Sequence, residues 1–180
     1  MATPTPTRAA SLRRRPMTGR PRRLWLTAHI GFSVGWLGAA YCMLVLAVTG
    51  LLAGDLELRV ACYELMHLFD EAVNIPLGLS MLGTGLVVSL RTKWGLLRHR
   101  WVLTKFIAST LTLILTPVLS VPRVLDTIAR LRAGAGLAST PLQIIAISAA
   151  VVATLTTMTT ISIFKPWGRT RWGVPARPSS

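Results

Sequence analysis

The stretch that decides the fold is LWLTAHIGFSVGWLGAAYCMLVLAVTGLLAG, residues 24–54, which contains no Asp, Glu, Lys or Arg. An α-helix rises about 1.5 Å per residue, so about 20 apolar residues cross the hydrocarbon core of a bilayer. The 31 residues of this stretch are enough for one crossing with tilt. A signal peptide has an apolar core of only about 7–15 residues, so we expect the segment to remain as a signal-anchor.

Similar uncharged runs recur along the chain. Its composition is 52% hydrophobic and only 14% charged, whereas a soluble domain carries about 25% charged residues. These features predict an all-α fold, a transmembrane four-helix bundle with spans at about 24–52, 72–91, 101–121 and 141–164. We expect a disordered basic cytoplasmic tail at 1–23 and a second basic cytoplasmic tail at 165–180. Translation from Met17 instead of Met1 would leave this prediction unchanged.

The basic residues predict the orientation. The net charge of +14 is held in short blocks between uncharged runs, which is typical of membrane topology and gives no reason to expect a nucleic-acid partner. With the N-terminus inside, 16 of the 20 basic residues fall in cytoplasmic segments and 4 in outer segments. This positive-inside bias predicts cytoplasmic N- and C-termini. The excess of Arg over Lys is typical of GC-rich bacteria, so we expect a multi-pass protein of a bacterial plasma membrane.

Two ionisable residues are predicted to share one depth inside the membrane. His29 lies about 7–8 Å into the first span and Lys105 about 6 Å into the third, at 1.5 Å per residue. Both spans start on the cytoplasmic side, and His99 lies just before the third. Ionisable groups inside a span are costly and are functional candidates for that reason. The alternative is structural: Lys105 extends to the headgroups along its stem, and His29 hydrogen-bonds to a neighbouring helix.

Two segments carry a resemblance to known membrane proteins. Trp25-x-x-x-His29-Ile30-x-Phe32-x-Val34-x-Trp36 resembles the first helix of J-type protoporphyrinogen oxidases, small bacterial membrane proteins that bind haem b. Trp94-Gly95-Leu-Leu-Arg98-His99-Arg100-Trp101-Val102-Leu-Thr-Lys105 resembles a helix start of that family and of copper-resistance D-type proteins. The whole chain looks most like uncharacterised four-helix actinobacterial integral membrane proteins. The resemblance implies that His29 is a haem-associated histidine and Lys105 an essential lysine, with a lysine or His99 as second axial ligand.

A second group of candidate ligands precedes the second span. Glu64, His67 and Glu71 lie at i, i+3 and i+7, on one face of a helix, with Asp70 beside them. Carboxylates with an imidazole suit zinc, iron or manganese, so the three residues are a candidate metal site. The alternative is a solvated helix start, where acidic residues are favoured.

The sequence leaves three functions open. We expect first a non-catalytic accessory or partner-binding membrane protein, with other membrane subunits or further copies of itself as partners. The second is a haem- or metal-binding redox protein that uses His29 and Lys105. The third is a small oligomeric permease. Small residues that allow close helix packing support all three; they are Gly31, Gly35, Gly38, Gly78, Gly83 and Gly85.

Overall fold

The computed structural model describes residues 17–91, 96 and 99–164, and its described part is entirely helical, without strands. The helices are α1 (Gly19–Leu52), α2 (Leu56–Phe69), η1 (Asp70–Asn74), α3 (Ile75–Arg91), α4 (Arg100–Arg132) and α5 (Thr140–Phe164). Four helices are long and apolar enough to span a membrane: α1, the continuous α2–η1–α3, α4 and α5. The predicted all-helical fold with four such helices is confirmed.

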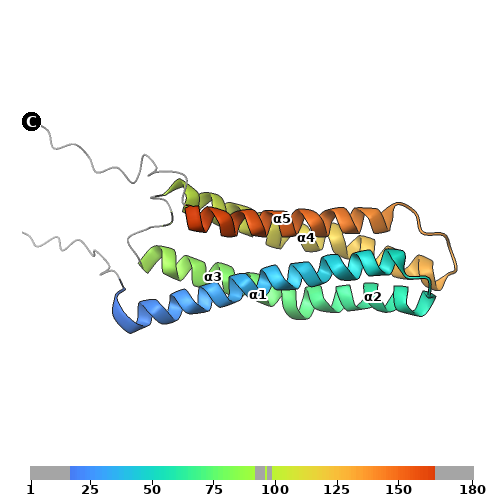
Figure 1. The fold of residues 1–180 in the computed structure, drawn as a ribbon, viewed down its shortest axis with the longest axis horizontal. Coiled ribbons are helices and arrows are strands. Elements are labelled where there is room, and N and C mark those ends of the chain that lie inside the picture. Colours follow the sequence, from blue (N-terminus) through green and yellow to red (C-terminus); the bar gives the residue numbers. More distant parts are fainter. Residues whose placement is uncertain (1–16, 92–95, 97–98, 165–180) are drawn as a thin grey trace, which may run out of the picture.

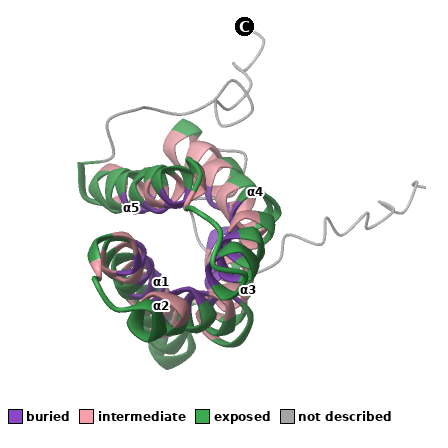
Figure 2. Ribbon diagram, turned by 90° about the vertical axis from the view of Figure 1, so that its right-hand side faces the viewer, coloured by how far each residue is buried: buried purple, intermediate pink, exposed green. Residues whose placement is uncertain are grey.

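The helices run up and down as an elongated bundle (Figure 1). Within it, α1 packs against α3, α2 and α5, and α4 packs against α5, α2 and α3. Each long helix therefore contacts two neighbours around a ring, and the buried residues face the centre of that ring (Figure 2). The start of α1, the end of α3, the start of α4 and the end of α5 share one end of the bundle, called here the proximal end (Figure 1).

The helices exceed the spans predicted from hydropathy. The second begins at Leu56 instead of about 72, because Asp55 caps it by accepting from the backbone N–H of Leu58 at 2.9 Å. Residues 19–23, expected in a disordered tail, form the start of α1. Residues 1–16 and the predicted tail at 165–180 lie outside the described residues.

Helix α4 continues beyond the predicted end of the third span at about 121, and it contains two prolines. Pro117 and Pro122 both lie inside Arg100–Arg132. Proline removes a backbone donor and bends a helix in water, but packed membrane helices tolerate it. The helix ends before Gly134, whose positive φ of 65° suits glycine and closes the last turn.

Apolar residues are found both inside and outside the bundle. One buried cluster, distal to the shared end, includes Met43, Tyr63, Met66, Val124 and Ile144, and a second includes Trp36, Met81 and Leu155. Large apolar side chains also cover the outer surface, among them Leu24, Val34, Leu52, Val118 and Leu142. A water-soluble surface rarely exposes apolar patches of this extent, whereas contact with lipid requires them.

Candidate functional site

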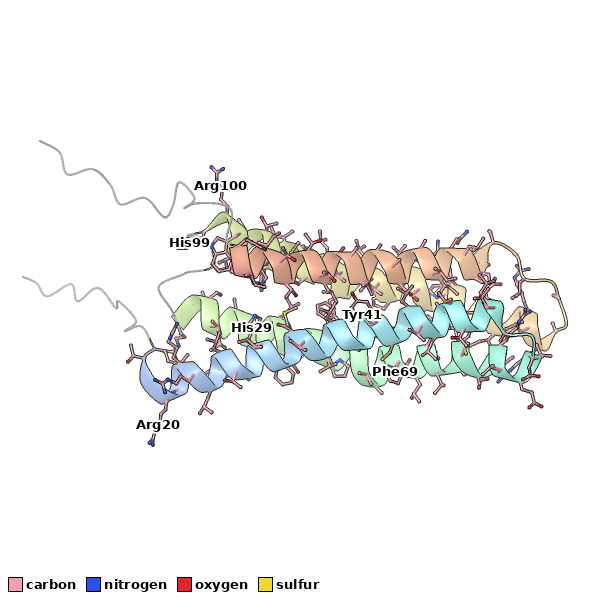
Figure 3. All side chains as sticks on the ribbon, in the orientation of Figure 1. Arg20, His29, Tyr41, Phe69, His99 and Arg100 are labelled. Atoms are coloured by element: carbon pink, nitrogen blue, oxygen red, sulfur yellow. The ribbon has the colours of Figure 1, made fainter. Side chains whose placement is uncertain are left out.

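His29 is held inside the bundle by α3. Its Nδ1 lies 3.1 Å from the carbonyl oxygen of Met81 and 3.2 Å from the hydroxyl oxygen of Thr84, and Figure 3 shows the side chain between α1 and α3. The Thr84 hydroxyl donates its own proton to the carbonyl of Ser80 at 2.7 Å, so it accepts from His29. Both partners are therefore acceptors, and Nδ1 carries a proton. In the neutral imidazole, Nε2 then keeps its lone pair.

A glycine on α3 makes room for this ring. A Cβ on Gly85 would lie 2.8 Å from Cε1 of His29 and 3.3 Å from Nδ1. Any side chain at this position would force the imidazole to move. Gly85 is thus required for the close approach of α1 and α3 at the histidine.

Lys105 approaches the same region from α4. Its Nζ donates to the hydroxyl of Ser162 on α5, and that hydroxyl donates to the carbonyl of Met158 at 3.0 Å. The side chain is half-buried. The amino group is thus bound to a neighbouring helix.

His29 and Lys105 line one cavity of about 510 Å³ near the proximal end of the bundle. All four long helices contribute to its walls, and most of the lining side chains are apolar. Polar groups are few and come from separate helices; they include His29, Ser33, Ser89, Lys105 and Ser162. A mainly apolar cavity with a few convergent polar groups is the usual form of a small-molecule site.

The third predicted haem residue, His99, is placed differently. It lies at the N-cap position of α4, near Arg100 at the proximal end of the bundle (Figure 3). Its ring centroid is 6.3 Å from that of Trp101. Trp101 lines the cavity, but His99 does not belong to the lining. Of the three residues, the structure brings together His29 and Lys105.

The predicted metal ligands lie on an outward face of α2 and η1. Glu64 forms an ion pair with Arg132, while His67 Nε2 and Glu71 Oε1 lie 3.7 Å apart. Within residues 17–91, 96 and 99–164, no three His, Cys, Asp or Glu side chains are grouped closely enough to hold a metal ion. The predicted trio therefore does not form a metal centre in this structure, because the Glu64 carboxylate is engaged by α4.

Sequence reasoning missed the residues that position the pair. Thr84, Gly85 and Ser162 contact His29 or Lys105 from other helices, and no local pattern relates them to their partners. Sequence reasoning also placed Asp70 beside the metal ligands, whereas the structure buries it. The sequence does contain a signal for Asp70: it continues the stripe of Tyr63 and Met66 at i, i+3 and i+7, and both of these are fully buried.

The chain matches no family model, and no curated protein or solved structure is detectably similar to it. A function can therefore be inferred only from the geometry of the cavity and of the side chains that line it.

Proposed function

We propose that this chain is an integral membrane protein that binds an amphipathic, anionic ligand in the cavity between its helices, and that this ligand is haem b. The volume of about 510 Å³ falls within the range of about 300–1,000 Å³ typical of small-molecule sites. The mainly apolar lining suits a flat macrocycle. The single observation that carries the proposal is the hydrogen bonding of His29.

The His29 ring is prepared as a metal ligand. A histidine that binds a metal donates its other ring N–H to a carbonyl, carboxylate or water, which fixes its tautomer and orientation. Nδ1 of His29 has this arrangement with the carbonyl of Met81 and the hydroxyl of Thr84. Nε2 is the nitrogen available to iron, and a single axial histidine is sufficient to hold a haem.

Lys105 supports the choice of an anionic ligand. It lines the same cavity, and its amino group has one hydrogen-bond partner in the described part of the chain, the Ser162 hydroxyl. An ammonium group has three donors, so it can bind a carboxylate while keeping this contact. Lys105 would therefore hold a propionate group of the macrocycle and His29 its iron. When bound, haem would supply one-electron chemistry at this site.

The charge distribution supports a direction in the membrane. The proximal helix ends contain five arginines: Arg20, Arg22, Arg23, Arg91 and Arg100. In contrast, all six acidic residues lie in the part of the sequence from Asp55 to Asp126. We infer from the positive-inside bias that the proximal end faces the cytoplasm of a bacterial cell and that the plasma membrane is the location. A non-catalytic accessory role, with other membrane subunits or further copies of this chain as partners, stays a prediction.

An absorption spectrum tests the proposal. The full chain, purified in detergent and titrated with haem, should give a Soret band at one haem per protein. His29→Ala should abolish the band. The matched control is His67→Ala, which removes a histidine far from the cavity and should leave the band unchanged. Absence of a saturable Soret band in the unaltered protein, or its full retention in His29→Ala, would overturn the proposal.

A second variant separates the charge from the iron ligand. Lys105→Met keeps a long unbranched side chain and removes the ammonium group. Loss of a charge-assisted hydrogen bond costs about 1.5–3 kcal/mol, so haem affinity should fall by about 10- to 100-fold. The position of the Soret band should remain the same, because His29 still binds the iron.

A further inference from the structure

A second polar site lies deeper in the bundle, around the π-helix η1. Asp70 begins this segment and is only 2% exposed. Asn74 donates from Nδ2 to Asp70 Oδ1 at 3.0 Å. Two buried oxygens of this pair, Asp70 Oδ2 and Asn74 Oδ1, have no hydrogen-bond partner in the described structure. Buried polar atoms are almost always satisfied, so both oxygens require a ligand.

Both residues line a small cavity of about 30 Å³. A cavity that holds one water needs about 10–15 Å³ by the same measure, so there is room for one or two particles of that size. Trp36 lines both this cavity and the larger one. No other described residue lines both cavities, so this site is distinct from that of His29 and Lys105.

Two serines on the other helices complete the wall. Ser120 of α4 and Ser148 of α5 are buried and line the cavity. Hydroxyls in this bundle usually donate to the carbonyl four residues earlier, as those of Thr112 and Thr127 do. In contrast, the described structure gives neither serine a hydrogen bond, so their oxygens are available to a ligand.

A proline in the same wall leaves one backbone carbonyl without its usual helical partner. Pro117 lines the cavity and has no N–H, so it cannot pair with the carbonyl of Leu113, four residues earlier. Leu113 is itself part of the lining. The cavity is lined by residues that carry carboxylate, amide and hydroxyl oxygens, the donor atoms that hard cations prefer.

The charge of Asp70 also requires a partner. A carboxylate inside an apolar medium is costly unless it is paired. The described residues include no ion pair to Asp70; the nearby His67 is paired with Glu71 instead. A single carboxylate is balanced by a single positive charge. Divalent cations fit less well, since Mg²⁺ keeps several waters and Ca²⁺ takes about 6–8 oxygens.

We propose that Asp70, Asn74, Ser120 and Ser148 form a binding site for one dehydrated Na⁺ ion at the centre of the bundle. The ion would neutralise the Asp70 carboxylate and satisfy the unpaired oxygen of Asn74. It would also bind α4 and α5 to the π-helix, so Na⁺ should stabilise the bundle. The site does not depend on haem binding, because Nε2 of His29 takes no part in it.

Radioactive ²²Na⁺ binding to the purified full chain in detergent tests this site. We expect saturable binding of one Na⁺ per chain, with choline chloride replacing the salt. Asp70→Asn keeps the shape and removes the charge, and should weaken binding by about tenfold or more. Glu71→Gln, which alters an exposed neighbouring carboxylate, is the matched control and should bind normally. His29→Ala should also bind Na⁺ normally.

Two outcomes would overturn the proposal. One is the absence of saturable Na⁺ binding in the unaltered protein, which would show that Asp70 is neutralised by a proton. The other is unchanged binding in Asp70→Asn. If Asp70→Asn does not fold, Ser120→Ala combined with Ser148→Ala keeps the carboxylate and removes two oxygens. This double variant should weaken Na⁺ binding, and unchanged affinity would likewise overturn the proposal.

Discussion

The substitution Gly85→Ala tests the placement of His29 most directly. The added Cβ would lie 2.8 Å from Cε1 of the imidazole, whereas ordinary contact begins at 3.4 Å. The ring must therefore move by about 0.6 Å, or the helices must separate by that distance. Unlike the end of a flexible chain, the ring is fixed by hydrogen bonds on its Nδ1.

The cost follows from these bonds. They measure 3.1 Å to the Met81 carbonyl and 3.2 Å to the Thr84 hydroxyl. A shift of about 0.6 Å directly away from α3 would lengthen both beyond about 3.5 Å, where they cease to be hydrogen bonds. If both bonds are lost, each loss costs about 0.5–1.5 kcal/mol. If the bonds are kept instead, overpacking causes a strain of about 1–3 kcal/mol. We expect the free energy of unfolding to fall by about 1–3 kcal/mol.

Gly83→Ala is the matched control. Gly83 lies on the same helix, and a Cβ there would meet nothing within 4 Å. In both variants alanine replaces a helical glycine, and this replacement favours the helix by about 0.5–1 kcal/mol. The difference between the two variants therefore isolates the contact with His29.

Unfolding by increasing sodium dodecyl sulfate in mixed micelles, followed by circular dichroism, measures the difference. Gly85→Ala should unfold at a lower denaturant fraction than Gly83→Ala, and it should bind haem more weakly. Equal stability of the two variants, within about 0.5 kcal/mol, would refute the close approach of α1 and α3 at His29. Lower stability with unchanged haem affinity would refute the role of the ring orientation.

Three other measurements test separate parts of the structure. Tyr63→Phe should raise the free energy of unfolding by about 1 kcal/mol, since it removes a buried hydroxyl that has no partner in the described structure; the exposed Tyr41→Phe is its control, and destabilisation by Tyr63→Phe would contradict the absence of a partner. Arg132→Ala breaks the exposed pair with Glu64 and should cost less than about 1 kcal/mol in the same unfolding assay. A maleimide that cannot cross the membrane should label Ser180→Cys only after the cytoplasmic side is opened; labelling of intact cells would contradict the proposed orientation.

The common level of His29 and Lys105 along the bundle was predictable because a helix has a constant rise. Counting residues from the ends of two parallel spans placed His29 and Lys105 at one level, and in the structure both residues line one cavity. The partners of these residues could not be predicted in the same way. Thr84 and Ser162 lie 55 and 57 residues away from them, and which helices are neighbours in the ring is decided by packing, not by hydropathy.

Helix limits were less predictable, for a related reason. Hydropathy detects the part of a helix that suits lipid, so the charged residues between 55 and 71 placed the predicted start of the second span too late. The backbone continues through them because no proline or glycine interrupts residues 55–75. In α4 the predicted span likewise stopped short, at about 121, whereas the helix continues through Pro122 to Arg132 and packs against α2 and α5.

The second site was missed because of a choice between two adjacent helix faces. Glu64, His67 and Glu71 share one face at i, i+3 and i+7, and their side chains suggested a metal centre. Tyr63, Met66 and Asp70 have the same spacing one residue earlier, and this face is the buried one. A lone carboxylate on an otherwise apolar stripe lacks the usual pattern of a metal site. Its position among buried apolar residues is nevertheless the stronger evidence, because an exposed carboxylate is hydrated by solvent, whereas a buried one without an ion pair must find its counter-charge inside the protein.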